Sequence, residues 1–363
     1  MIKRVFNKLE RYYLKRKGYS SFSRIRLLND ENKNSVLPRD QKRWASKRGF
    51  FTYRILQYGL TDENWKSTLS DRDYAFLQPL NDRYRFWVLD KLTMKYVLAP
   101  FDRYMPRYFF HIMKDRGIMR LMDCPEQYTA SPDGVLALIK EQGIVAAKPS
   151  DGAKGKGFLK LEADGSGVIV NNQAYSDEAF KDLLAQWEDY VVTEYVKMHP
   201  DIEKLNPCSV NTIRCTVINE HGDDPILPFA FMRVGTRRSG VVDNTSAGGM
   251  ICKVDVATGR FYDGETLTDH VYKKAEYHPD THEKMEGVLP QWDLVKTEVL
   301  RICKYMPDLE WLGFDVVITP DSFLILEINT AQDLHKAHEY PAAVNDYLFR
   351  KLHEKKVAYG IKQ

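Results

Sequence analysis

The chain has 363 residues, enough for two or three domains with sizeable cores, and its 44% hydrophobic and 28% charged residues are typical of a globular protein. No apolar run approaches the roughly 18 residues that a membrane-spanning helix needs, and the basic N-terminus lacks the apolar core of a secretory signal. We therefore expect a cytoplasmic protein. Its scattered cysteines, odd in number and without a CxxC spacing, argue against a disulfide framework and against a zinc site. They are Cys124, Cys208, Cys215, Cys252 and Cys303.

Positive charge is concentrated at the N-terminus. The net charge is only +3, but residues 1–54 hold 16 Lys and Arg against 4 Asp and Glu, which leaves −9 for the rest of the chain. In residues 1–19, apolar and aromatic side chains alternate with Lys and Arg at near-helical spacing. This pattern fits a helix lying on an anionic membrane surface, at its inner face, and equally a solvated helix that caps the fold. A nucleic-acid partner is not expected, because no recognition motif accompanies the charge.

The first half of the chain divides into two expected units. Residues 1–89 predict a basic, mainly helical region, with helical pieces rich in Arg and aromatic residues at 44–60 and 62–77. A second unit is expected over residues 90–145. It begins with the segment DKLTMKYVL, passes through a helix near 106–117 and ends with a helix around PDGVLALIKEQG.

Strand-rich sequence begins at Gly143. We expect one unit over residues 146–198, with a glycine loop between two strands, and another over residues 199–350. Few helices interrupt the strands, so we predict an α+β fold with mostly antiparallel sheets. The expected strands are 143–150, 158–162, 191–196, 211–219, 226–235, 249–256, 311–319 and 322–330, and the expected helices are 176–190 and 292–306.

The loop KPSDGAKGKGF combines glycines with lysines. Its glycines let the backbone approach a ligand and direct N–H groups at it, while its lysines supply positive charge, so it suits a polyphosphate. The GK[ST] ending and following helix of a Walker A loop are missing, and a hairpin lid over phosphates is the closer expectation. Taken alone, the same residues also fit a simple basic turn. The residues are Lys148, Gly152, Lys154, Gly155, Lys156 and Gly157.

A second signal comes from the segments FDVVIT and FLILEI near the end of the chain. If they form a hairpin with a three-residue turn at 320–322, Thr319 pairs with Phe323 and, stepping outward, Asp315 pairs with Glu327. Directly paired residues project from the same face of the sheet. The hairpin therefore predicts two carboxylates side by side.

Asn329 adds an amide to this pair. It lies two positions beyond Glu327, so both side chains project from the same face of the strand. Two carboxylates this close repel each other unless a cation lies between them. Hard oxygen ligands of this kind suit Mg²⁺, whereas the alternative is a strand end with solvated acids.

With both signals in one chain, the sequence resembles the ATP-grasp superfamily over roughly residues 90–345. Members have two α+β lobes that hold ATP between them, a glycine-rich lid, a lysine on each side of the nucleotide, a hinge containing Glu, and a closing Asp and Glu-x-Asn set that binds Mg²⁺. The resemblance implies that fold here, together with Asp315, Glu327 and Asn329 as metal ligands, ATP, and two Mg²⁺ ions.

The resemblance also implies a nucleotide site. Lys91 in DKLTMKYVL resembles the first nucleotide lysine and Lys148 in VAAKP the second, both on the phosphates or the N7 side of adenine. In VVTEYV, Glu194, Tyr195 and Val196 resemble the hinge whose backbone meets the adenine edge.

One branch of the superfamily fits more closely. The ordered blocks HPDIEKLNPCSVNTIRCTVI, RVGTRRSGVVDNTSAGGMICKVDVATGRF, YHPDT and the LGFDVVI to LILEINT ending resemble the sugar-transfer-associated ATP-grasp family, which is found with genes for capsule and surface polysaccharide assembly. From the superfamily resemblance, an acid just past the hinge, Asp201 or Glu203, is expected to hold the ribose hydroxyls. The resemblance implies no role for the first 90 residues.

Two middle blocks suit reactive oxyanions. Arg214 lies in an expected strand and offers a permanently charged, bidentate donor for an acyl phosphate or a γ-phosphate, although a surface ion pair is the simpler explanation. Asp243 and Asn244 precede Gly248 and Gly249, whose backbone N–H groups are expected to face an oxyanion if the segment is more than a loop.

The function implied by the resemblance is that of an ATP- and Mg²⁺-dependent ligase, which joins a small-molecule carboxylate to an amine or a sugar hydroxyl through an acyl phosphate. This reaction requires no nucleophile from the protein. Catalysis is expected to come from positioning and from charge neutralisation by Mg²⁺, Lys148 and Arg214, with Asn244 assisting. The expected product is a cell-surface or capsular polysaccharide precursor carrying an amino acid or related group. Two alternatives stay open: a kinase acting on a sugar or polyol hydroxyl, and a non-catalytic nucleotide-binding adaptor of polysaccharide assembly.

Overall fold

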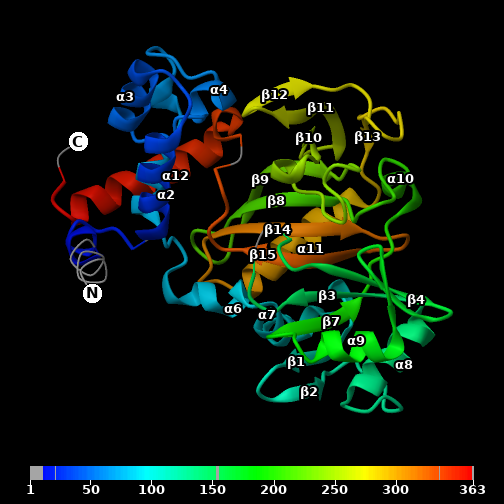
Figure 1. Ribbon diagram of the computed structural model, residues 1–363. Helices are drawn as coiled ribbons and strands as arrows, with labels where there is room; N and C mark the ends of the chain where they lie inside the picture. The colour runs from blue at the N-terminus through cyan, green and yellow to red at the C-terminus, as the bar shows by residue number, and fades with distance from the viewer. Residues whose placement is uncertain (1–10, 21, 153–154, 335, 362–363) are drawn as a thin grey trace.

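The computed structural model describes residues 11–20, 22–152, 155–334 and 336–361 (Figure 1). The basic segment at 1–19 therefore lies partly outside the described residues, and its described part is helical over residues 11–16. Within the described ranges, no helix combines the length and the apolar character that crossing a bilayer requires.

Two antiparallel sheets form the body of the molecule, as predicted (Figure 1). The strands of the first sheet are β1 (Tyr108–Met113), β2 (Gly117–Arg120), β3 (Ile144–Pro149), β4 (Leu159–Asp164), β5 (Gly167–Val170), β6 (Gln173–Ser176) and β7 (Tyr190–Glu194). Their order is β2-β1-β7-β3-β4-β5-β6. This single sheet crosses the expected unit boundary between residues 145 and 146, which falls inside β3, so that boundary does not separate two sheets.

The second sheet contains the predicted strands of the C-terminal half. Its strands are β8 (Thr212–Ile218), β9 (Ile226–Val234), β10 (Met250–Val254), β11 (Arg260–Thr268), β12 (Val271–Lys274), β13 (Gly287–Val288), β14 (Trp311–Ile318) and β15 (Phe323–Asn329). Their order is β12-β11-β10-β9-β8-β14-β15, with β13 pairing to β11.

Helices surround the sheets and form the N-terminal region (Figure 1). In the N-terminal part they are α2 (Phe22–Asn34), α3 (Arg39–Arg48), α4 (Arg54–Tyr58), η1 (Trp65–Ser67), α5 (Asp71–Leu77), η2 (Asp82–Arg85), α6 (Phe86–Leu89), α7 (Lys91–Val97) and η3 (Ala99–Tyr104). Further on they are α8 (Pro132–Gln142), α9 (Asp177–Leu184), α10 (Pro200–Glu203), η4 (Thr245–Ala247), α11 (Trp292–Tyr305), η5 (Ala337–Glu339) and α12 (Ala342–Ala358). The predicted helical character of the N-terminal region is confirmed.

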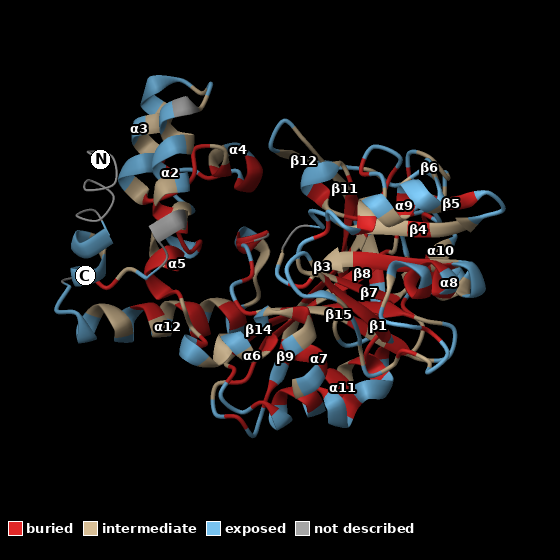
Figure 2. Ribbon diagram, turned by 60° about the horizontal axis from the view of Figure 1, so that its bottom comes forward, coloured by how far each residue is buried: buried red, intermediate tan, exposed pale blue. Residues whose placement is uncertain are grey.

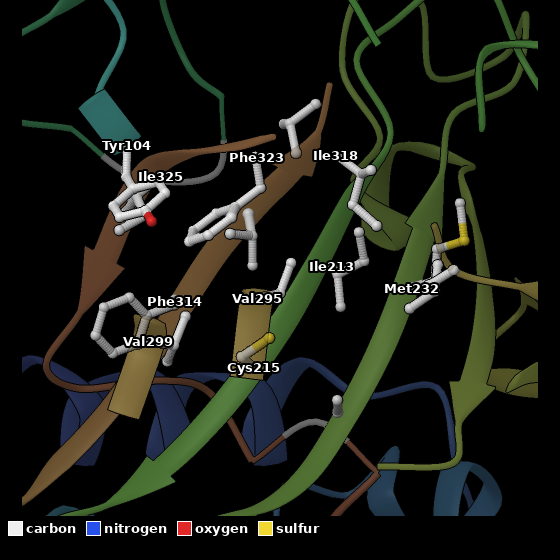
Figure 3. Close-up of a cluster of buried hydrophobic side chains, with 14 of the residues drawn as sticks. Tyr104, Ile213, Cys215, Met232, Val295, Val299, Phe314, Ile318, Phe323 and Ile325 are labelled. Atoms are coloured by element: carbon white, nitrogen blue, oxygen red, sulfur yellow. The ribbon is translucent and has the colours of Figure 1, made fainter. Parts of the chain in front are cut away.

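Strand alternation decides which residues of the second sheet face the core. Ile213 and Cys215 of β8 lie in the same buried cluster as Val295 and Val299 of α11 (Figure 3). Because successive strand residues point to opposite faces, Arg214 projects from the face that α11 does not cover. The buried residues concentrate in the strands, whereas the surface of α3 is largely exposed or half-buried (Figure 2).

The predicted helix at 106–117 is wrong. This segment forms the hairpin of β1 and β2, with Phe110 opposite Arg120 and a turn that ends at Gly117, whose φ is 76°. Residues 108–112 are all buried. A strand covered on both faces reads as a continuous apolar run, and periodicity cannot separate such a run from a buried helix.

The N-terminal helices share a core with the C-terminal end of the chain. Phe50, Tyr74 and Phe76 pack in one buried cluster with Trp311 of β14 and Leu348 of α12. The expected helical piece at 44–60 is interrupted after α3 by Gly49, which has a left-handed φ of 84°. The N-terminal region is therefore packed onto the second sheet by apolar contacts.

Candidate active site

A cleft of about 1280 Å³ lies among three parts of the molecule: the first sheet with its glycine loop, the uncovered face of the second sheet, and the N-terminal helical region. Most of the predicted site residues line it. They are Lys91, Lys148, Gly152, Gly155, Lys156, Glu194, Tyr195, Val196, Arg214, Asn244, Asp315, Glu327 and Asn329.

Asp315 of β14 lies directly opposite Glu327 of β15, as the hairpin pattern predicts. The turn itself differs from the prediction, because Ile318 rather than Thr319 pairs with Phe323. A β-bulge next to Asp315 absorbs the extra residue and restores the predicted register. The two carboxylates are therefore neighbours despite an error of one residue in the predicted turn.

Asp315 is the centre of a buried polar cluster. Its Oδ1 accepts from Nε of Arg214 at 2.6 Å, and its Oδ2 lies 3.1 Å from Nη2 of Arg214 and 3.2 Å from Nη2 of Arg233. Burial alone would raise the pKa of Asp315, but the two guanidinium groups outweigh it and hold the pKa below its usual range. Burial and the charge of Asp315 raise the pKa of Glu327 above its usual range. The negative charge of Asp315 is thus well compensated by the two arginines, whereas that of Glu327 is poorly compensated.

This donor set fits Mg²⁺. The raised pKa of Glu327 indicates unbalanced negative charge in a buried place, which a cation would relieve. The described part of the chain contains no group of three or more His, Cys, Asp or Glu side chains that could hold a metal ion, and this site has only two carboxylates. Two carboxylates are sufficient for Mg²⁺, which takes its other ligands from water and substrate phosphates. The amide nitrogen of Asn329 lies 3.3 Å from Oδ2 of Asp315, so Asn329 can offer its oxygen to a metal only after the amide turns over.

Across the cleft from the carboxylates lie lysines without acidic partners. Nζ of Lys91 donates to the Gly152 carbonyl at 3.0 Å, and Nζ of Lys148 lies 5.8 Å from the ring centre of Tyr108. Burial lowers the pKa of Lys148 to about 7, with a further contribution from the charge of Lys91 and partial opposition from Glu327. The Gly152 carbonyl does not neutralise Lys91, and the charge of Glu327 compensates the two lysines only in part. Such uncompensated positive charge suits phosphate oxygens.

The glycine loop closes against the opposite wall. A Cβ at Gly155 would lie 2.7 Å from Cγ1 of Val242, and one at Gly157 would lie 2.9 Å from Cγ of Pro149; both glycines have positive φ, 67° and 77°. Glycine is therefore required at both positions. Gly157 does not line the cleft, and Lys154 lies outside the described residues.

The predicted hinge lines the cleft, but the predicted ribose acids do not. The carboxylate of Glu194 accepts from the backbone N and the Nε of Arg107 at 3.0 and 2.9 Å, so this side chain braces the hinge. Asp201 and Glu203 lie outside the cleft wall, and Asp201 faces Lys204 at 3.4 Å. Their position does not favour contact with a ribose.

The predicted oxyanion role of the two loop glycines is wrong. The Gly248 amide donates to the Thr245 carbonyl at 3.1 Å and the Gly249 amide donates to the Asn244 carbonyl at 3.0 Å, so both N–H groups are already used within the loop. Asn244 itself lines the cleft.

Arg233 is a site residue that the sequence analysis missed. Its Nε donates to Oγ1 of Thr212 at 2.9 Å and lies 3.5 Å from Asp243, while its Nη2 reaches Asp315. Burial raises the pKa of Asp243, although Arg233 opposes the shift. The signal was present, because Arg233 interrupts the apolar segment FAFMRVG much as Arg214 interrupts β8. Part of the cleft wall, formed by residues between Ser20 and Arg85, was likewise not predicted from the sequence.

Comparison with known proteins adds a family and several structural likenesses. A family model described as sugar-transfer associated ATP-grasp matches residues 71–339. The chain is similar to the ATP-grasp ligase PsnB complexed with a minimal precursor, Mg and ADP, with 14% identity, a TM-score of 0.37 and coverage of 75% of this chain and 61% of that chain. It thus spans about three fifths of the length of PsnB. No curated protein matches the chain.

Two further solved structures show similar likeness. For D-alanine–D-alanine ligase from Bacillus anthracis the identity is 14% and the TM-score 0.39, with coverage of 75% of this chain and 68% of that chain. For a complex of biotin carboxylase from Campylobacter jejuni the identity is 14% and the TM-score 0.43, with coverage of 77% of this chain and 47% of that chain.

Proposed function

The chain belongs to the sugar-transfer associated ATP-grasp family, whose model matches well over half of it, and from this premise we propose that it is an ATP- and Mg²⁺-dependent ligase that joins a carboxylate to an amine or a hydroxyl. One observation carries the proposal. Lysines without acidic partners face a buried pair of carboxylates across one cleft, which suits a polyphosphate on one side and a divalent cation on the other.

In the proposed reaction, the γ-phosphoryl group of ATP moves to the substrate carboxylate with release of ADP, and an amine or hydroxyl then displaces the phosphate. Lys91 and Lys148 neutralise the phosphate oxygens, and Arg214 orients Asp315 through two hydrogen bonds. Asp315 and Glu327 would hold Mg²⁺, with Asn329 after its amide turns. Bound Mg²⁺ would neutralise charge on the phosphates. No side chain of the protein has to act as a nucleophile.

We further propose that the substrates belong to the assembly of a surface polysaccharide, with an amino acid or related group as the one joined. The description of the family as associated with sugar transfer supports this substrate class. Contact with the inner face of a membrane is part of the same proposal. It is supported by the exposed Tyr12 and Tyr13, 62% and 56% accessible, beside the exposed Lys15, Arg16 and Lys17.

The products of ATP turnover test this proposal against its alternatives. The protein is incubated with Mg·ATP and a panel of amino acids and sugar acids, and ADP, free phosphate and new masses are measured. A ligase releases ADP and phosphate in equal amounts with a new condensed product. A kinase releases ADP without free phosphate, and an adaptor releases neither, so either of these results would overturn the proposal.

A further inference from the structure

The cleft is larger than one nucleotide site requires. Small-molecule pockets usually enclose about 300–1,000 Å³, whereas this cleft encloses about 1280 Å³. One end carries the lysines and the carboxylate pair. The other end is bounded by the N-terminal region and the turn between β11 and β12. We name this end the N-terminal compartment, defined by Arg24, Tyr53, Arg54, Gln78, His270 and Asp333.

The N-terminal compartment adjoins the proposed reaction centre. Gln332 and Asp333 follow closely after Asn329, the last residue of β15, and both line the cleft. A Cβ at Gly313 would lie 2.4 Å from Oε1 of Gln332 and 3.1 Å from Cδ of Arg214. The wall therefore continues from Arg214 through Gln332 to Asp333, and a ligand in the compartment lies beside the carboxylate pair.

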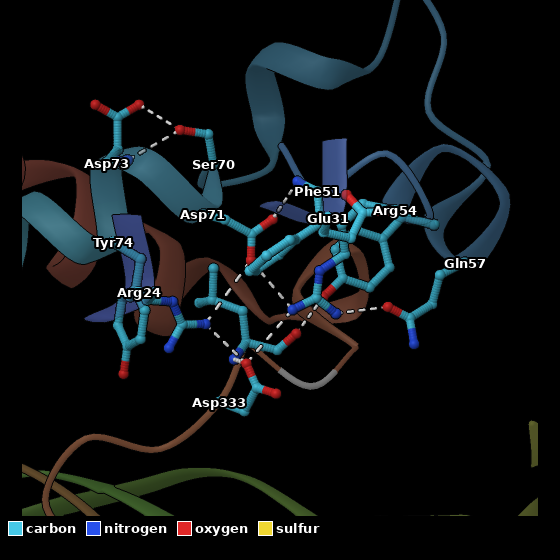
Figure 4. Close-up of polar contacts among 12 residues, drawn as sticks. Arg24, Glu31, Phe51, Arg54, Gln57, Ser70, Asp71, Asp73, Tyr74 and Asp333 are labelled. Carbon is cyan, nitrogen blue, oxygen red and sulfur yellow. Dashed lines mark hydrogen bonds and ion pairs between the residues drawn. The ribbon is translucent and has the colours of Figure 1, made fainter. Parts of the chain in front are cut away.

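The arginines of the N-terminal compartment are paired with carboxylates. Arg24 lies 2.8 Å from Asp333, and Arg54 lies 3.2 Å from Asp71 and 3.4 Å from Asp333, measured from each Nη2 to Oδ1 (Figure 4). Two guanidinium groups thus face two carboxylates. The positive charge of both arginines is therefore neutralised, and Glu31 and Asp269 also line this end of the cleft. Unlike the end that carries the lysines, the compartment does not suit a polyphosphate.

The compartment nevertheless holds donors that lack acceptors. Nε of Arg24, Nε of Arg54 and Nε2 of Gln78 are buried and have no hydrogen-bond partner among the described residues. Arg54 is only 2% exposed and Gln78 only 5%. Buried donors left unpaired cost free energy, and small movements of these side chains toward an oxygen-rich ligand would satisfy them.

A stack of rings forms one side of the compartment. Phe51 and Tyr53 stack at 5.3 Å between ring centres, and Tyr53 and His270 stack at 4.8 Å with 18° between the ring planes. His270 lies on the tight turn between β11 and β12, where both Asp269 and His270 have positive φ. Its ring ends the stack and is exposed, and the residue lines the cleft. A flat exposed ring beside polar donors is suited to the C–H face and the hydroxyls of a sugar.

We propose that the N-terminal compartment binds the sugar unit of the substrate, a ring rich in oxygen acceptors that carries at most one negative charge. This inference rests on the proposed function. The occupant follows from three observations together: unpaired donors, arginines already neutralised by carboxylates, and a stacked ring. An aliphatic amino acid such as alanine has no ring to lie against His270, and a peptide is the competing occupant that the experiment has to exclude.

The test uses the full-length protein saturated with Mg·ADP. Calorimetric titration with N-acetylglucosamine, glucuronate, alanine and trialanine is expected to show saturable binding of at least one of the two sugars and none of alanine or trialanine. Binding of trialanine alone, or of neither sugar, would overturn the inference. Titration with Mg·ADP itself separates the two proposals. If it does not bind, the proposed function fails, whereas if it binds and neither sugar does, only this inference fails.

Variants then locate the sugar. His270→Asn removes the ring but keeps a residue that tolerates positive φ, and it should weaken sugar binding roughly three- to tenfold while leaving the affinity for Mg·ADP unchanged. The matched control is His221→Asn, an exposed histidine outside the cleft, which should change neither affinity. Arg54→Lys should weaken sugar binding further, with thermal unfolding measured to confirm the fold. Equal sugar affinities for His270→Asn and the unaltered protein would overturn the inference.

Discussion

Two walls of the cleft are built in different ways. On the second sheet, strand alternation and pairing place Arg214, Asp315 and Glu327 on one face. On the N-terminal wall, side chains reach across the molecule to backbone groups. The Tyr74 hydroxyl donates to the Gln332 carbonyl at 2.6 Å, and Nδ2 of Asn81 donates to the Thr330 carbonyl at 3.0 Å.

The difference shows what the N-terminal region does. These two long-range hydrogen bonds end on the segment that directly follows Asn329, the last residue of β15. It therefore braces the loop beyond the carboxylate pair and completes the cleft, rather than forming an independent appendage. Under the proposed function, the carboxylates that hold Mg²⁺ belong to the sheet wall, whereas the N-terminal wall supports the loop after β15 and binds the sugar. This division can be tested from both sides.

The largest effect is expected on the sheet wall. Glu327→Ala removes one of the two carboxylates proposed to hold Mg²⁺, so ATP turnover should fall by about a thousandfold or more. Circular dichroism and thermal unfolding should show an intact fold. Glu178→Ala, on the exposed surface of α9, is the matched control. Unchanged turnover in Glu327→Ala would remove the ligase and kinase interpretations together.

On the N-terminal wall, the largest effect should be on stability. Asn81 is 2% exposed, and Nδ2 donates to the Trp311 and Thr330 carbonyls while Oδ1 accepts from the Glu310 and Trp311 amides. Asn81→Ala leaves these buried groups unpaired and should lower the free energy of unfolding in urea by about 3 kcal/mol.

Asn64→Ala is the control for this measurement, because Asn64 is exposed and bonds only within its own loop. It should cost less than about 1 kcal/mol. Equal losses for the two variants would mean that the N-terminal wall is not braced against the second sheet through Asn81.

The proton affinity of Lys148 offers a smaller test of the nucleotide end. With a pKa of about 7, the Lys148 side chain carries its positive charge below pH 7 and loses this charge as the pH rises through that value. The affinity for ADP without Mg²⁺ should therefore fall about tenfold between pH 6 and pH 8. Lys148→Arg keeps the charge throughout and should flatten the profile. A flat profile in the unaltered protein would contradict the prediction.

The smallest effect is expected at the exposed N-terminal basic surface. Arg16→Gln should weaken binding to vesicles that contain phosphatidylserine by about fivefold, because one basic residue near an anionic surface contributes about 1 kcal/mol. Sedimentation with vesicles measures this binding. Lys114→Gln, at an exposed basic residue on the turn between β1 and β2, serves as the control. Equal losses would show that the effect is one of net charge alone.

Much of the second sheet could be predicted because its signals are local. Alternation in β8 and β15 placed Arg214 and Glu327 on the correct face, and the polar residues stood out against apolar neighbours. The exact turn could not be predicted, since a bulge that adds a residue on one strand leaves no mark in the apolar pattern. The hairpin of β1 and β2 was missed because both faces of β1 are buried.

By itself, the sequence determined the α+β class, five strands of the second sheet (β8, β9, β10, β14 and β15) and the common face of Glu327 and Asn329, because these follow from residue periodicity over a few positions. The strands β11, β12 and β13 were not predicted, and the pairing of Asp315 with Glu327 was correct only because a bulge offset the error in the turn. Only the tertiary structure decided that Arg233 joins this pair, that Asp201 and Glu203 lie away from the cleft, and that the N-terminal helices form its far wall. The physical reason is the range of the interactions. Contacts between residues hundreds of positions apart depend on how whole elements pack, and no local pattern records them.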